Sequence, residues 1–133
     1  MSDEAFVSTM SKERRKEIGE IAIKIAPVAR KYGLRYVWLF GSRARGDARP
    51  DSDVDLLITR EGSSVKSLLD LSGLYIDFQR ALGTELDLVT LEALDHELNR
   101  DRPSSRRFRE NIDREKVIVY GVEERLGEGQ RAP

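Results

Sequence analysis

The sequence contains no cysteine and only one histidine, His96, among its 133 residues. Without cysteine, the chain can form neither disulfide bonds nor thiolate metal sites, and it has no cysteine nucleophile. A His-rich zinc site is excluded as well, and a Ser-His-Asp triad would depend on His96 alone. If the protein is an enzyme, carboxylates would therefore be its main catalytic groups.

Long apolar runs are also missing. No stretch approaches the roughly 18–20 apolar residues that a membrane span requires. The acidic N-terminus, residues 1–4, lacks the apolar core of a secretory signal. We therefore expect a cytoplasmic protein that has no membrane partner.

The sequence also lacks an excess of positive or negative charge. Lys and Arg total 23 and Asp and Glu total 24, which gives a formal net charge of −1. General nucleic-acid binding needs a strong basic excess, so we expect none here. The length suits one domain with a core of its own.

The apolar spacing predicts helices that alternate with short strands. Apolar residues three and four apart predict a helix over 11–32, with Ser11 as its N-cap and Gly33 at its end. Pro27 predicts a kink in this helix or a break into two helices. Further helices are predicted over 65–82, 92–99 and 105–113. Strands are predicted at 35–40, 53–58, 86–89 and 116–120.

This order of elements predicts an α/β (α+β) protein with helices packed on a mixed sheet. The short link at 41–52 permits antiparallel pairing of the first two strands, which disfavours an all-parallel sheet. We expect an N-terminal tail at 1–13, one domain at 14–120, and a disordered, polar C-terminal tail at 121–133.

The most informative pattern is a pair of aspartates, Asp53 and Asp55, in the second predicted strand. Side chains alternate in a strand, so both would point to one face, with Cα atoms about 6.5–7 Å apart. Such carboxylates can share one divalent ion or flank two ions about 3.5–4 Å apart. Asp87 lies between two leucines in the third strand, and it would join them if the two strands are neighbours. Mg²⁺ is the cation that suits these oxygen ligands.

Gly41 and Ser42 are separated from the aspartate pair by ten intervening residues. A glycine lets the backbone approach a ligand closely, and Ser42 is a suitable N-cap for a short helix. Free N–H groups at that point, with Arg43 and Arg45 nearby, would favour phosphate. Asp-x-Asp or Gly-Ser alone is commonly found at turns and surfaces. Their combination predicts a site for a metal-bound polyphosphate.

These residues resemble the nucleotidyltransferase superfamily that includes DNA polymerase β. The shared pattern is an apolar strand, Gly41-Ser42, a spacer, Asp53-Val54-Asp55 and a later strand aspartate, Asp87. Within the superfamily, residues 40–46 are most similar to the minimal nucleotidyltransferases (MNT) of HEPN/MNT toxin–antitoxin systems. The resemblance covers roughly residues 14–120 and implies the polymerase β-like nucleotidyltransferase fold.

The resemblance also implies a mechanism with two Mg²⁺ ions and ATP as substrate. Asp53 and Asp55 would hold the metal of the triphosphate and share the second ion. Asp87 would complete the second site and assist deprotonation of the attacking hydroxyl. Gly41 and Ser42 would bind the β- and γ-phosphates, with Arg43 and Arg45 as further nucleotide-binding candidates.

The partner implied by the resemblance is a HEPN-type RNase toxin, which the MNT antitoxin would inactivate by transferring AMP to a tyrosine. An arginine-rich stretch could dock an acidic surface of that partner; its members are Arg100, Arg102, Arg106, Arg107 and Arg109. Two alternatives remain open at this point. The chain could modify a small-molecule hydroxyl, as aminoglycoside-modifying relatives do, or it could be a non-catalytic antitoxin that only occludes its partner.

Overall fold

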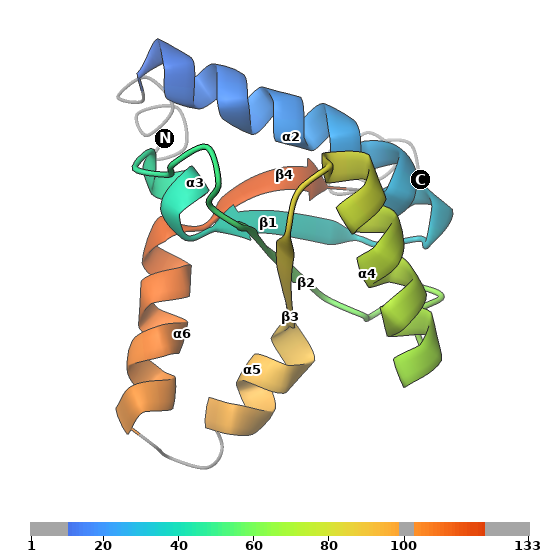
Figure 1. Cartoon of the computed structure of the whole chain (residues 1–133). Coiled ribbons are helices and arrows are strands. Elements are labelled where there is room, and N and C mark those ends of the chain that lie inside the picture. Colours follow the sequence, from blue (N-terminus) through green and yellow to red (C-terminus); the bar gives the residue numbers. More distant parts are fainter. Residues whose placement is uncertain (1–10, 99–102, 122–133) are drawn as a thin grey trace, which may run out of the picture.

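The computed structural model describes residues 11–98 and 103–121 of the chain. Its strands are β1 (Tyr36–Phe40), β2 (Val54–Ile58), β3 (Leu86–Thr90) and β4 (Val117–Gly121). They form one sheet in the order β3-β2-β1-β4 (Figure 1). β1 is antiparallel to both β2 and β4, whereas β2 and β3 are parallel. The predicted mixed sheet and the antiparallel pairing across 41–52 are confirmed.

Helix α2 (Lys12–Lys31) begins at the predicted cap, since the Ser11 side chain accepts the N–H of Arg14 at 3.1 Å. It runs through Pro27 as one helix, so a break into two helices is not found. Proline removes one backbone donor, which would have bonded the carbonyl of Ile23. Pro27 and Ile23 both lie on the exposed face, where water can replace the lost bond.

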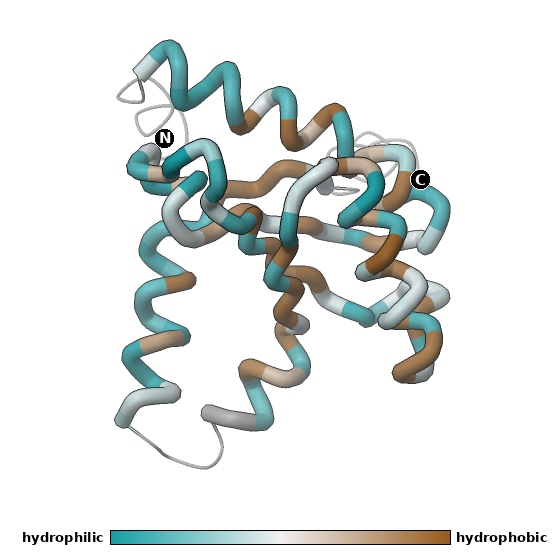
Figure 2. Tube along the Cα trace, in the orientation of Figure 1, coloured by the Kyte–Doolittle hydropathy of each residue, from teal (hydrophilic) through white to brown (hydrophobic). Residues whose placement is uncertain are grey.

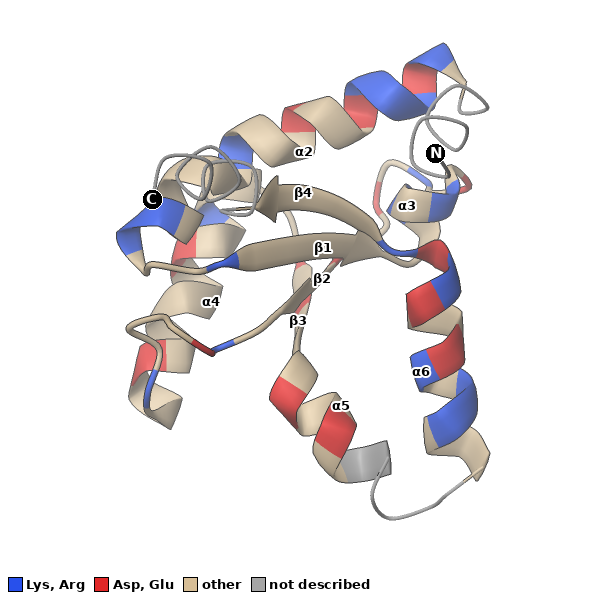
Figure 3. Ribbon diagram, turned by 180° about the vertical axis from the view of Figure 1, so that it is seen from behind, with Lys and Arg blue, Asp and Glu red and all other residues tan. Residues whose placement is uncertain are grey.

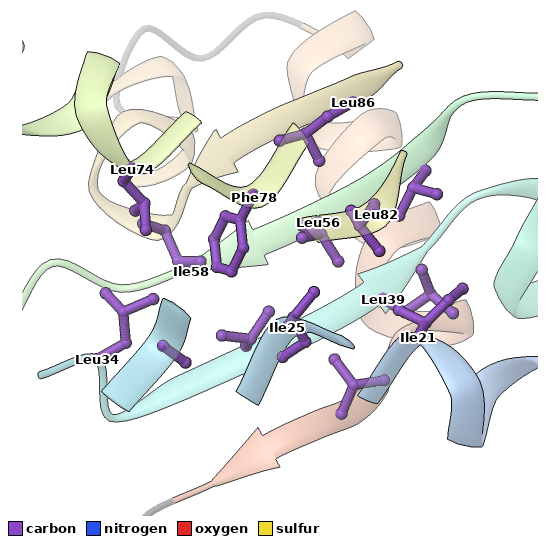
Figure 4. Packing of buried hydrophobic residues seen from close by; sticks show 14 of the residues in the cluster. Ile21, Ile25, Leu34, Leu39, Leu56, Ile58, Leu74, Phe78, Leu82 and Leu86 are labelled. Carbon is purple, nitrogen blue, oxygen red and sulfur yellow. The ribbon is translucent and has the colours of Figure 1, made fainter. Parts of the chain in front are cut away.

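Helices α2 and α4 (Leu68–Leu82) cover one face of the sheet. Helix α4 begins at a capping box, in which Ser67 and Asp70 bond each other's backbone N–H, and it ends at Gly83. Figure 4 shows its apolar side chains over β2, with those of α2 meeting β1. This main core includes Ile21, Ile25, Leu39, Leu56, Ile58, Leu74, Phe78 and Leu82.

The other face of the sheet meets α5 (Leu91–Leu98) and α6 (Pro103–Glu115). Their contact is a second, smaller core made of Phe40, Leu57, Leu94 and Ile112. Figure 2 shows the strands as mostly hydrophobic and α6 as mostly hydrophilic, with apolar residues at intervals. Figure 3 shows acidic and basic residues along α2 and α6, which is typical of helices that bury only one stripe.

Two details close to the Gly41 turn and the aspartates also differ from the sequence-based expectations. The short helix α3 (Ser42–Arg45) has Gly41 as its N-cap, so Ser42 is its first helical residue instead of its cap. Strand β2 begins at Val54, which leaves Asp53 just before the strand. Most of the two expected tails, residues 1–10 and 122–133, lies outside the described residues. Among the described residues, no helix has the length and apolarity to cross a membrane.

Candidate active site

Asp55 and Asp87 lie side by side because their strands are paired in parallel. In this register Asp55 of β2 is the direct Cα partner of Asp87 of β3. Such partners lie about 4.8 Å apart across a sheet. Both residues alternate with buried core positions and share the sheet face that α5 and α6 approach. The conditional prediction that Asp87 would join Asp55 if their strands were neighbours is therefore met.

The two aspartates line a cavity of about 370 Å³ between the end of β1, helix α3 and helix α6. Five of the seven predicted site residues line it, namely Gly41, Ser42, Arg45, Asp55 and Asp87. Asp53 and Arg43 are not among its lining residues. The volume lies within the range of small-molecule sites, roughly 300–1,000 Å³.

The electrostatics of the cavity are dominated by negative charge. Burial, together with the neighbouring carboxylates of Asp87 and Asp53, raises the pKa of Asp55 to about 6. The guanidinium of Arg45 acts in the opposite direction but does not cancel these effects. Like charges held together at a partly buried position favour either protonation or a bound cation.

These carboxylates suit a divalent cation in chemical kind and in charge, since Mg²⁺ prefers oxygen ligands. Within residues 11–98 and 103–121, however, no three His, Cys, Asp or Glu side chains already form a cluster that could hold a metal ion. Asp53 is exposed and precedes the strand, although it is near enough to affect the pKa of Asp55. Its part in a metal site remains a prediction.

Gly41 allows the backbone to pass directly beside Asp55. Its φ is +79°, a conformation that residues with a side chain rarely adopt. A Cβ atom placed there would overlap Oδ2 of Asp55 and lie 2.9 Å from its Cγ. The glycine is therefore required both for the turn and for the position of the carboxylate.

Arg43 does not share the cavity with the aspartates. Its guanidinium forms an ion pair with Glu17 of α2 and donates to the carbonyl of Ser52 at 2.7 Å and of Pro50 at 3.3 Å. These contacts connect α2 and α3 to the loop that leads into Asp53. The geometry favours a structural role over the predicted contact with nucleotide.

Arg45 lines the cavity and contacts Glu115, a residue that was not predicted from the sequence. Its Nη1 donates to both carboxylate oxygens of Glu115 at 3.2 Å, and its Nε donates to Asp47 at 3.2 Å. Glu115 also accepts the backbone N–H of Gly41 at 2.9 Å. No local motif marks Glu115, because the contact joins residues 74 positions apart.

The arginine-rich stretch is only partly within the described residues. Arg100 and Arg102 lie outside them. Arg109 pairs with Asp95 at 2.6 Å and with Asp113 at 3.2 Å, so it connects α5 and α6 within the chain. Arg106 and Arg107 are exposed on α6. The docking of a partner by this stretch stays a prediction.

Comparison with known proteins gives the family. The model of the family described as "Polymerase beta, Nucleotidyltransferase" matches residues 23–124, which include all the strands described above. The chain belongs to this nucleotidyltransferase family. The family assignment agrees with the fold and with the enzyme class expected from the sequence.

Two curated relatives of this nucleotidyltransferase are archaeal. A protein from Methanocaldococcus jannaschii, MJ0435, provisionally named a protein adenylyltransferase, is 40% identical over 85 residues; the match covers 64% of this chain and 88% of the relative. The protein adenylyltransferase MntA of Thermococcus cleftensis is 39% identical over 64 residues, which cover 48% of this chain and 63% of MntA.

Solved structures support the same fold. A chain from a toxin–antitoxin complex with AMP-PNP superposes on this nucleotidyltransferase with a TM-score of 0.55 at 20% identity. The match covers 77% of this chain and 75% of that chain. A chain of the MntA–HpeT toxin–antitoxin complex superposes with a TM-score of 0.54 at 18% identity and covers the same shares.

Proposed function

We propose that this nucleotidyltransferase uses Mg²⁺ and ATP to transfer AMP to a tyrosine hydroxyl of a HEPN-type toxin, and that it thereby acts as an antitoxin. The observation that carries the proposal is the pairing of Asp55 and Asp87 beside Gly41 in one cavity. Two carboxylates and a close backbone turn are what a metal-bound triphosphate requires.

Each residue of the cavity has a role in this proposal. Asp55, with Asp53 beside it, would hold the metal ions, whose charge stabilises the entering and leaving oxygens. Gly41 and Ser42 would bind the β- and γ-phosphates, and Arg45 would add a cation. Asp87 is exposed and can accept the proton of an incoming hydroxyl. The hydroxyl oxygen then bonds to the α-phosphorus, and pyrophosphate leaves.

The choice of a protein as acceptor is supported by the relatives. The M. jannaschii and T. cleftensis proteins are named as protein adenylyltransferases, and the structural neighbours form toxin–antitoxin complexes. The described residues form a single sheet with its covering helices, without a second domain to enclose a large acceptor. In this proposal the acceptor hydroxyl is brought to the cavity by a partner protein.

The test is incubation of the purified chain with ATP labelled in the α-phosphate, Mg²⁺ and a purified HEPN-type toxin as the partner. We expect label on a tyrosine of that partner, loss of the partner's RNase activity, and no label when Asp55→Asn replaces the wild type. Label on an aminoglycoside but not on the partner would replace the protein acceptor with a small molecule. Inhibition of the partner without any label would show a binding antitoxin.

A further inference from the structure

Glu115, the last residue of α6, occupies the position at which the Gly41 turn offers its backbone donor. Its Oε1 accepts the N–H of Gly41 at 2.9 Å, and both of its carboxylate oxygens accept Nη1 of Arg45 at 3.2 Å. The side chain is 18% exposed, so much of this contact is shielded from water. A backbone N–H and a guanidinium that converge on one carboxylate form a charge-assisted anion site.

A carboxylate is an unexpected occupant of this anion site, because the cavity already carries negative charge. Glu115 lines the same cavity as Asp55 and Asp87, and its charge adds to those that disfavour ionisation of Asp55. A third carboxylate in this cavity is repelled by the other two, and the two donors that it contacts offset this repulsion. An anion with more charge and more oxygens would compete for these donors effectively.

We propose that Glu115 is an internal competitor for the polyphosphate of the nucleotide. It holds the N–H of Gly41 and the guanidinium of Arg45 until a nucleoside triphosphate takes both donors. Glu115 ends α6 and is separated from β4 by Lys116 alone, so the competing carboxylate sits where the chain returns from α6 to the sheet. The identification of the competing anion as a nucleotide rests on the proposed function, whereas the competition itself rests only on the contacts of Glu115.

The experiment compares the wild type with Glu115→Gln, with Glu110→Gln as the matched control. The control removes the same charge from an exposed position of the same helix. Inorganic tripolyphosphate without metal, and ATP with Mg²⁺, are titrated by calorimetry into each protein. We expect Glu115→Gln to bind both about tenfold more tightly, because a charge-assisted hydrogen bond no longer has to be broken. Glu110→Gln should match the wild type.

A second variant and a second measurement distinguish the proposed competition from an effect of misfolding. Glu115→Asp keeps the charge but withdraws the carboxylate by one methylene, and we expect an intermediate affinity. In both Glu115 variants the Gly41 amide should exchange its hydrogen faster than in the wild type. Unfolding curves must confirm that each variant is folded under the conditions of the titrations.

The outcomes separate the two proposals. Tighter tripolyphosphate binding by Glu115→Gln without binding of any nucleotide supports the competition and overturns the proposed function. Equal or weaker binding of both ligands by Glu115→Gln overturns the competition, and weaker binding would show instead that Glu115 helps to bind the ligand. Unchanged exchange of the Gly41 amide in both variants overturns it as well.

Discussion

Asp55 is half-buried beside two other aspartates, and this position raises the pKa of its carboxyl from an ordinary 3.8 to about 6. The folded protein therefore keeps a proton on Asp55 between about pH 4 and 6 that the unfolded chain has lost. The free energy of unfolding of the metal-free protein falls over this interval through this group, and it stays lowered above pH 6.

We predict that Asp55→Asn stabilises the metal-free protein at pH 7.5 by about 1–3 kcal/mol, since asparagine cannot ionise. The gain should shrink as the pH approaches 4, where Asp55 of the folded wild type is protonated. Urea unfolding of both proteins at several pH values in EDTA measures the difference. A variant less stable than the wild type at every pH would assign Asp55 a structural role.

Magnesium should reverse the order of stability of the wild type and Asp55→Asn. Excess Mg²⁺ at pH 7.5 is expected to raise the midpoint of thermal unfolding of the wild type, because a ligand that binds the folded state stabilises it. Asp55→Asn should respond much less, since it lacks one of the carboxylates. Equal shifts for both proteins would place the ion elsewhere.

At the scale of elements, the turn between β1 and α3 fixes Asp55 through Gly41. We predict that Gly41→Ala lowers the transfer activity by about 100-fold, because the new methyl group would displace the Asp55 carboxylate. Its control is Gly83→Ala, which has a similar φ of +72° and nothing within 4 Å of the new Cβ. Gly83→Ala should lose about 1–2 kcal/mol of stability from its left-handed backbone conformation. Gly41→Ala should lose more, because its ψ of −160° and the clash with Asp55 add strain. Only Gly41→Ala should lose activity, and equal activity of the two would contradict this reading.

Arg43 offers a second test at this scale, because it holds the 49–52 loop from outside the cavity. We predict that Arg43→Lys lowers kcat by about tenfold, since lysine cannot reproduce the fork of contacts that positions the loop. The KM for ATP should stay close to that of the wild type. A large increase in KM with unchanged kcat would instead support a contact between Arg43 and the triphosphate. Arg15→Lys, exposed on α2, is the control.

Much of the element level is visible in the sequence, since apolar spacing locates the main helices and strands. The alternation of apolar residues around Asp55 and Asp87 predicts that each aspartate points away from the core. Only the structure shows that their strands are neighbours. Glu115 could not be found in this way, because its contact with Gly41 depends on how α6 returns to the sheet. The role of Arg43 is likewise hidden, since its partners lie on α2 and in a loop.

At the scale of the whole molecule, the two cores on opposite faces of the sheet have different relations to the site. Leu74 belongs to the main core, whereas Ile112 belongs to the small core and lines the cavity one turn before Glu115. We predict that Leu74→Ala and Ile112→Ala each lose about 2–4 kcal/mol of stability. Activity, assayed where both variants are folded, should fall much further in Ile112→Ala. Equal losses of activity would show that the small core does not position the site.

The pairing of β2 with β3 also has a consequence for how the sequence can change. Asp55 and Asp87 are adjacent because of strand register and not because they are close in sequence. A slip of β3 by one residue would turn Asp87 to the opposite face. An insertion at the exposed residues 61 and 62 would leave both carboxylates in place, whereas Thr59, Ser63 and Val65 of the same loop are buried. Engineered insertions at this exposed point should therefore add surface to the enzyme without altering its chemistry.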